Sequence, residues 1–266
     1  MLGMALNINE HRIRYDDKCS GQVSCTIKFT PDVTLESPNL YYEIENFYAN
    51  HRNFVKSLSY SQLRGNADAS TSSCDPIENN KDVRTDLQAL DGTKLPDNGK
   101  ANPCGLRAKY IFTDTYTLFN GNNPVPIDET KISHSVDRNS KFQRPDNYRS
   151  IQWNDTANEH LMVWFQTDAF PDFIKLWGRI DQDLNAGTEY TIHISNTWST
   201  SEIEAKKYIF LTETNAFGGR NLVFGVLYVV GGSIFFLLSL VMVVLEIIKR
   251  KNKSRLNKTA PNVIPY

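Results

Sequence analysis

The chain has 266 residues, of which 40% are hydrophobic and 22% are charged, so its composition is that of a folded protein rather than a disordered one. The formal net charge is −1, but six of the 29 basic residues and only one acid follow Leu245. A mildly acidic body with a basic end argues against nucleic-acid binding by the body.

Four cysteines lie in the first part of the chain: Cys19, Cys25, Cys74 and Cys104. An even number permits two disulfides in an oxidising compartment, with three possible pairings. We favour the local pairing of Cys19 with Cys25 and of Cys74 with Cys104. The second bridge would close a loop of about 30 residues and contribute about 3–4 kcal/mol. Free buried thiols are the alternative, and no CxxC or HExxH spacing indicates a metal site.

Alternation of apolar and polar residues predicts β-strands at Val23–Phe29 and Tyr190–Ser195. Short apolar runs at Leu161–Phe165 and Tyr208–Leu211 predict strands that are buried on both faces. Apolar residues at helical spacing across Phe47–Leu58 predict one helix that packs a face on a sheet. These elements predict a mainly β, sandwich-like antiparallel domain with long loop insertions and a short helix.

Two loops interrupt the predicted strands. Residues Arg64–Asn102 are poor in apolar side chains, so this loop is predicted to be held by Cys74 and Cys104 rather than by a core of its own. The second loop runs over Asn120–Asn158 and contains an Asn-Asp-Thr sequon at Asn154. Asn154 is therefore predicted to carry a glycan on a lumenal surface loop.

No catalytic signature appears, because both the GxxxxGK[ST] and the GxSxG motifs are missing. The five histidines have no metal-ligand spacing, and Asp181 and Asp183 lie in a predicted turn. The sequence thus predicts no catalytic residue, no metal and no cofactor. The four tryptophans are candidates for a carbohydrate-binding platform: Trp153, Trp164, Trp177 and Trp198. Trp164 lies in a buried apolar run, which favours core packing for that residue.

Residues Leu222–Leu245 form an uncharged apolar segment that is long enough to cross a bilayer. The segment has no polar stripe, which favours a spanning helix over a buried core helix. The segment that follows the span is rich in Lys and Arg, and such basic segments are found mainly on the cytosolic side of a membrane. Residues 7–220 are therefore predicted to be extracytoplasmic, and residues 246–266 to form a basic cytosolic tail. The tail is interpreted as a topology signal, with contact to anionic lipid as the alternative.

Gly225, Gly232 and Ser239 recur every seven residues within the predicted span. Seven residues are close to two helical turns, so the three share one helix face. Small residues on one face let another helix approach closely in lipid. We predict that this face contacts a partner's transmembrane helix. The alternative is chance, because glycine is common in membrane helices.

Five segments share their order and spacing with a known family: Tyr41–Leu63, Asn102–Thr115, His160–Ile180, Leu184–Tyr190 and Asn215–Ser233. The most specific parts are the NFYxNHR and PCG segments and the GG[KR]N entry to the span. Together they resemble the cell division control protein 50 / ligand-effect modulator 3 family over essentially the whole chain. Its members are accessory (beta) subunits of type-IV P-type ATPases.

The resemblance implies a non-catalytic subunit of a phospholipid flippase. Such a subunit binds the ATPase through transmembrane and lumenal contacts, allows it to leave the endoplasmic reticulum, and supports its stability and activity. It is an integral membrane protein of the endoplasmic reticulum, Golgi or plasma membrane, in contact with membrane lipids. The family has two membrane helices around a glycosylated β ectodomain. By this resemblance we expect residues 1–6 to be a remnant of the first helix, and the rest of that helix to be missing from this chain.

The resemblance also matches Cys74 and Cys104 to a bridged pair, and Cys19 and Cys25 to a second cysteine cluster from which one bridge is absent. Two other interpretations remain. A single-pass cell-surface receptor or adhesion protein, with a glycan- or protein-binding ectodomain, accounts for the sequon, the disulfides and the tryptophans but not for the matched segments. A membrane-tethered enzyme needs a catalytic constellation that the sequence does not contain.

Overall fold

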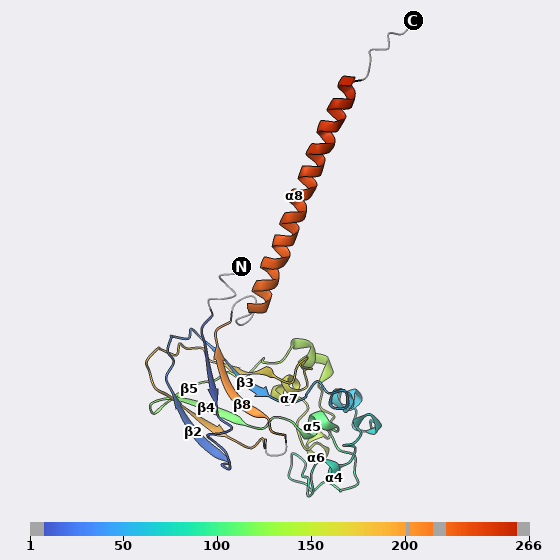
Figure 1. Ribbon diagram of the computed structural model, residues 1–266. Coiled ribbons are helices and arrows are strands. Elements are labelled where there is room, and N and C mark those ends of the chain that lie inside the picture. The colour runs from blue at the N-terminus through green and yellow to red at the C-terminus, as the bar shows by residue number, and fades with distance from the viewer. Residues whose placement is uncertain (1–7, 201–202, 215–221, 260–266) are drawn as a thin grey trace. The chain divides into compact units, whose positions relative to one another are not determined.

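The computed structural model describes residues 8–200, 203–214 and 222–259 (Figure 1). The chain divides into two compact units. The unit Asn9–Glu213, called the head below, contains strands β1 to β8. The other unit includes the long helix α8 (Leu222–Thr259). The predicted remnant at 1–6 lies outside the described residues, and the predicted boundaries at 7, 220 and 246 stay predictions.

The head is built on two four-stranded antiparallel sheets, as the alternating patterns predicted. The strand order is β1-β8-β3-β6 in one sheet and β2-β7-β4-β5 in the other. The first sheet consists of β1 (Glu10–Arg14), β3 (Asn39–Glu45), β6 (Phe173–Arg179) and β8 (Lys206–Thr212). The second consists of β2 (Ser24–Phe29), β4 (Thr115–Asn120), β5 (Asn123–Val125) and β7 (Tyr190–Ser195).

Each strand follows from its residue pattern. In β2, Cys25, Ile27 and Phe29 are buried and the residues between them are exposed, so one face of this sheet packs inward. Strand β7 alternates in the same way, and Ile192 pairs with Ile27. Strand β8 lies between β1 and β3 and is buried almost throughout, which confirms the strand predicted from the continuous apolar run.

The inner faces of the two sheets share one hydrophobic core, as in a β-sandwich. Tyr116 of the second sheet meets Trp177 of the first edge to face, with ring centroids 5.1 Å apart. Tyr42 of β3 stacks on Phe112, with ring centroids 4.0 Å apart. Buried aromatic rings therefore join the sheets to each other and to the segment that precedes β4.

The insertion between β3 and β4 holds short helices that gather beside the strands (Figure 1). They are α2 (Arg52–Lys56), α3 (Tyr60–Leu63), η1 (Ser72–Cys74), α4 (Asn80–Val83) and α5 (Leu106–Lys109). The single helix predicted over Phe47–Leu58 was only partly correct. Helix α2 ends at Lys56, and Ser59 caps the separate helix α3, so Phe47 and Leu58 are buried from the connecting segments rather than from one helical face.

The loop Arg64–Asn102 was predicted to lack a core of its own, and this was wrong in part. Leu87, Ala89 and Leu95 form a small separate cluster, which the partly buried Trp153 covers. The backbone of this loop also closes on itself, since Leu95 N donates to Leu87 O at 2.9 Å. Three apolar residues spread over nine positions are too sparse to be recognised as a core by periodicity.

The insertion between β5 and β6 holds the π-helix η2 (Asp137–Lys141), α6 (Tyr148–Ile151) and α7 (Glu159–Trp164). The strand predicted at Leu161–Phe165 is wrong, because this run is helical. Asn158 caps the helix by accepting a hydrogen bond from His160 N, and Leu161 to Trp164 are buried on every side. A short apolar run that is buried all round has no period that separates helix from strand.

Candidate functional site

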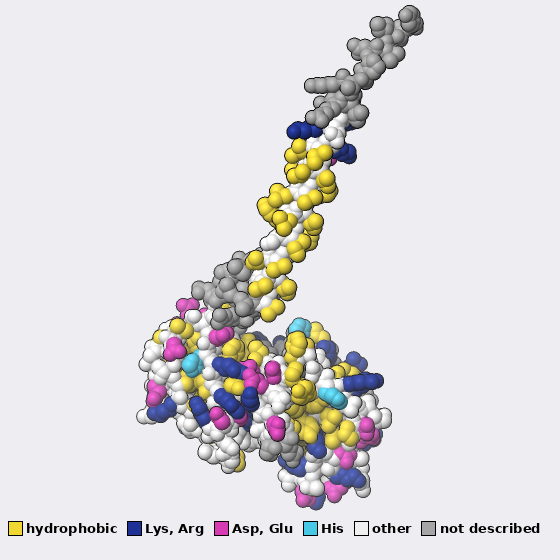
Figure 2. All heavy atoms as spheres, viewed as in Figure 1, with side chains coloured by type: hydrophobic (Ala, Val, Ile, Leu, Met, Phe, Trp, Pro, Cys, Tyr) yellow, Lys and Arg dark blue, Asp and Glu magenta, His cyan; other side chains and the backbone are white. Residues whose placement is uncertain are grey.

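Helix α8 carries the predicted partner-contact face. Residues Gly225–Lys253 contain an 18-residue window with a mean hydropathy of 2.5 and are long and apolar enough to cross a membrane, which confirms the predicted apolar helix. Figure 2 shows hydrophobic side chains along this helix and basic ones near its C-terminal end. The helix continues past Leu245 to Thr259, so the first residues of the predicted tail are also helical.

Gly225, Gly232 and Ser239 all lie in α8, which places them along one face with a small drift. Apart from the helix's own backbone, no described atom lies within 4 Å of the Cβ that a substitution at Gly232 would add. The same is true of Gly231. Contact of this face with another helix stays a prediction, since no partner chain is present.

The four cysteines form two disulfides, Cys19–Cys25 and Cys74–Cys104, with Cα–Cα distances of 5.6 and 5.7 Å. This is the local pairing. The second disulfide fixes the base of the first insertion, because Ser57 Oγ donates to Cys74 O at 2.8 Å. On the other side of the bridge, Cys104 N donates to the Gln62 side chain at 3.1 Å. These hydrogen bonds hold both ends of the loop between the two cysteines next to the segment that contains α3.

The predicted glycosylation residue Asn154 is half-buried in a bend between α6 and α7. The sequon hydroxyl on Thr156 is fully buried, and it donates to Gln143 O at 3.0 Å. It also lies 3.1 Å from Gln152 Nε2. A glycan on Asn154 would thus have to be attached before this bend folds, because the folded bend withholds the hydroxyl from an enzyme.

The tryptophans do not form the carbohydrate platform that the receptor interpretation would use. Trp164, Trp177 and Trp198 are at most 6% exposed. Trp153 is partly buried, and its Nε1 donates to Pro103 O at 2.7 Å. All four rings lie in the described ranges, and their contacts make them parts of the core and of its border.

The histidines and acidic residues do not converge. Within the described ranges, no group of three or more His, Cys, Asp or Glu side chains is placed to hold a metal ion. His51 caps α2, and His193 lies on the exposed face of β7, where it contacts Thr26 and Phe119. His160 stacks on Trp177, with ring centroids 3.9 Å apart.

Sequence patterns did not reveal the polar centre of the sandwich. Lys207 Nζ on β8 lies 2.6 Å from Asp114 Oδ2, and both side chains are at most 2% exposed. Tyr15 OH donates to the same carboxylate at 2.8 Å and contacts Tyr116 OH at 2.9 Å. Trp198 N donates to Asp114 Oδ1 at 2.6 Å. Burial lowers the pKa of Lys207 and raises those of Tyr15 and Tyr116.

A second buried pair lies at the edge of the helical insertions. Lys175 Nζ on β6 lies 2.8 Å from Asp168 Oδ2, and the Lys175 side chain is 3% exposed. Burial lowers the pKa of Lys175 and raises that of Asp168. Arg107 of α5 is also buried, and its Nη1 donates to Phe165 O at 2.7 Å. Nothing in local periodicity marks these residues, since Lys175 lies in an otherwise ordinary strand and Arg107 in a helix of only four residues.

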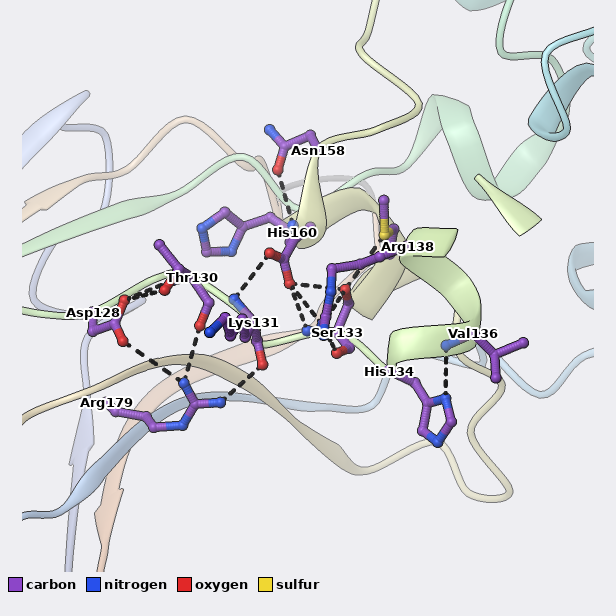
Figure 3. A network of polar contacts seen from close by, with 12 residues as sticks. Asp128, Thr130, Lys131, Ser133, His134, Val136, Arg138, Asn158, His160 and Arg179 are labelled. Atoms are coloured by element: carbon purple, nitrogen blue, oxygen red, sulfur yellow. Dashed lines mark hydrogen bonds and ion pairs between the residues drawn. The ribbon is translucent and has the colours of Figure 1, made fainter. Parts of the chain in front are cut away.

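Glu159 at the start of α7 organises the loop that leads to η2 (Figure 3). Its carboxylate accepts hydrogen bonds from Lys131 N at 2.9 Å, from Ser133 N at 3.0 Å and from Ser133 Oγ at 2.8 Å. Arg138 Nη1 of η2 lies 3.3 Å from the same carboxylate and also donates to Ser133 O. One carboxylate thus fixes the position of η2 relative to α7.

The other end of this loop is held by Arg179 of β6 (Figure 3). Its Nη1 donates to Thr130 O at 3.0 Å and its Nη2 to Lys131 O at 2.8 Å. Asp128 accepts from Thr130 N and from Thr130 Oγ1 at 2.9 and 2.7 Å. The loop is therefore built as a rigid connection between β6 and the helical insertions.

Comparison with known proteins agrees with the resemblance found in the sequence. The model of the LEM3 (ligand-effect modulator 3) family / CDC50 family matches residues 4–252. ALA-interacting subunit 3 of Arabidopsis thaliana is 32% identical, over 79% of this chain and 60% of that protein. Cell cycle control protein 50A of Bos taurus is 29% identical, over 84% and 68%.

The phospholipid-transporting ATPase accessory subunit LEM3 of Saccharomyces cerevisiae is 28% identical, over 85% of this chain and 59% of that protein. The chain therefore spans about three fifths to two thirds of the length of these relatives. The family model covers every strand and helix of the head and most of α8. The chain belongs to the CDC50/LEM3 family.

Proposed function

We propose that this chain is the non-catalytic accessory subunit of a phospholipid-transporting type-IV P-type ATPase. The family match over residues 4–252 carries the proposal, supported by the yeast relative, whose name describes an accessory subunit of such an ATPase. The subunit binds the ATPase, supports its export from the endoplasmic reticulum, its stability and its activity, and so supports movement of phospholipid between leaflets.

The proposed topology places the head on the lumenal or extracellular side and the C-terminus in the cytosol. Two disulfides in the head support this, because disulfides persist in oxidising compartments. The basic residues Lys249, Arg250 and Lys251 at the end of the apolar stretch support it as well. Residues 222–245 then form the span, between the extracytoplasmic residues 7–220 and the tail 246–266.

Affinity capture of the full chain from native membranes, followed by mass spectrometry, tests the proposal. A large multi-span P-type ATPase is expected as the dominant partner. Recovery of a cell-surface ligand in its place would favour the receptor or adhesion interpretation and overturn the proposal.

The contact through α8 is tested by Gly232→Leu, which would separate two close-packed helices. We expect at least a fivefold loss of captured ATPase. Gly231→Leu is the matched control, since that position is equally open and lies about 100° around the helix. If the two variants capture equal amounts of ATPase, the face formed by Gly225, Gly232 and Ser239 is not the contact. The identity of the ATPase as the partner would not be affected by that result.

A further inference from the structure

A cavity of about 500 Å³ opens between the two helical insertions of the head. Leu58, Leu63 and Arg107 line it from the first insertion, and Phe142, Met162 and Phe165 line it from the second. This volume is within the range of small-molecule sites. All of its lining residues belong to the head, and neither member of the buried Lys207–Asp114 pair is among them.

Arg107 is the unusual element of the cavity wall. Its side chain is only 5% exposed, and a guanidinium has five N–H donors. Among the described residues it makes one side-chain hydrogen bond, from Nη1 to Phe165 O at 2.7 Å. Its Nε is buried without a partner. Asp168 acts on this guanidinium only at longer range and is in direct contact with Lys175. A buried cation with no carboxylate in direct contact is costly, so this guanidinium is placed to receive an anion.

The nearby carboxylates are already engaged. Asp168 pairs with Lys175 at 2.8 Å, and Asp137 pairs with Lys141 at 2.9 Å. No described carboxylate lies within 4.0 Å of the Arg107 guanidinium. Arg64, which is exposed, adds a second cationic side chain to the lining. The cavity thus carries more positive than negative charge, which attracts anions toward Arg107.

The apolar part of the lining is held in place by contacts within the head. Phe142 and Phe165 meet edge to face, with ring centroids 5.8 Å apart. Met162 is fixed by Ser133 Oγ at 3.4 Å, within the network that Glu159 organises. Gln143 N donates to Leu63 O at 2.7 Å and joins the two insertions beside the cavity. The site is therefore preformed, with the buried Arg107 guanidinium beside an apolar wall.

We propose that this cavity binds a small amphiphile that carries an oxyanion, a phosphate or a carboxylate. The oxyanion binds Arg107, whose planar fork suits two parallel N–H···O bonds. The apolar part of the ligand packs against Leu63, Phe142 and Phe165. The proposal is independent of which ATPase the subunit accompanies.

Isothermal titration calorimetry on the full chain in phosphatidylcholine nanodiscs tests this, with hexyl phosphate as the probe. Two control ligands are titrated in the same way. Inorganic phosphate tests whether the anion alone binds, and hexanol tests whether the apolar chain alone binds. We expect hexyl phosphate to bind at least tenfold more tightly than either. Hexanoate, which offers a carboxylate on the same kind of chain, is expected to bind within tenfold of hexyl phosphate.

Arg107→Gln should weaken hexyl phosphate binding at least tenfold, while Arg149→Gln, at an exposed position elsewhere in the head, should leave it unchanged. Thr167→Trp is the second variant, because Thr167 is an exposed lining residue and the substitution fills the cavity mouth without removing a core contact. It should also abolish binding. The proposal is overturned if hexyl phosphate shows no saturable binding, if inorganic phosphate binds as well, or if both variants bind like the natural chain.

Discussion

Lys207 and Asp114 form an ion pair at the centre of the sandwich, 93 residues apart in sequence and 2.6 Å apart in space. Lys207 belongs to β8 of one sheet, and Asp114 immediately precedes β4 of the other. Lys207 Nζ also donates to Trp198 O at 2.8 Å and to Asn196 Oδ1 at 2.5 Å. The pair therefore ties the two sheets and the β7–β8 connection together.

Replacing Lys207 with Met should lower the free energy of unfolding by about 3–5 kcal/mol, because it leaves the Asp114 carboxylate buried without its cation. The double variant Lys207→Met/Asp114→Asn should recover part of this loss. Denaturant unfolding followed by tryptophan fluorescence measures both.

Lys206→Met is the matched control for Lys207, since Lys206 is the exposed neighbour and its ion pair with Glu45 spans 3.4 Å. Its cost should be below about 1 kcal/mol. If Lys206→Met and Lys207→Met destabilise the protein equally, the buried pair has no special role in joining the sheets.

Glu159 should make the stability of the head sensitive to acid. Burial alone would raise the pKa of Glu159, but hydrogen bonds from the Ser133 and Lys131 amides outweigh burial and hold the pKa below its ordinary value of 4.5. The unfolded chain then binds this proton more readily than the folded one. The stabilisation is present above the ordinary pKa and is lost as the pH falls through the lower pKa of the folded state.

Glu159→Gln should therefore cost about 1–2 kcal/mol near neutral pH and flatten the loss of stability below about pH 4.5. Denaturant unfolding at several pH values measures this. Glu189→Gln, which removes an exposed ion pair with Lys28, is the control and should change the pH profile little. A Glu159→Gln profile that runs parallel to that of the natural chain would contradict the assignment.

Removal of the two disulfides should have unequal effects. The Cys74–Cys104 bridge spans 30 residues and the Cys19–Cys25 bridge spans six. Chain entropy gives about 3–4 kcal/mol for the first and about 2–2.5 kcal/mol for the second. Paired Cys→Ala variants, compared by denaturant unfolding, test the order.

Hydrogen exchange adds a local readout to the Cys74/Cys104 variant. The loop between these cysteines contains only a small cluster of its own, so its amides should exchange faster while those of β3 and β8 stay protected. Uniform exchange across the head would show instead that the bridge stabilises the whole sandwich.

Asn154 should carry a glycan when the chain is made in cells that glycosylate secreted proteins. A glycosidase-sensitive mobility shift should disappear in Asn154→Gln and persist in Asn252→Gln and Asn257→Gln, whose sequons lie in the proposed cytosolic tail. Loss of the shift only in a tail variant would reverse the proposed topology.

Local sequence patterns determined much of this protein. Period-two alternation predicted the strands around Ile27 and Ile192, and an uncharged apolar stretch predicted α8, because both patterns record burial over a few neighbouring residues. The even number of cysteines and the ordered family segments were equally visible in the chain. The run at Leu161–Phe165 shows where this approach ends, since complete burial removes the period that separates helix from strand.

Only the tertiary structure decided which polar groups meet inside the head. Strand β8 lies between β1 and β3, and this long-range pairing places Lys207 opposite Asp114. The two helical insertions pack against each other, and this packing makes Arg107 part of the lining of the cavity between them. These contacts depend on the order of the strands and on the packing of segments that are far apart in sequence. A pattern of neighbouring residues contains no information about either.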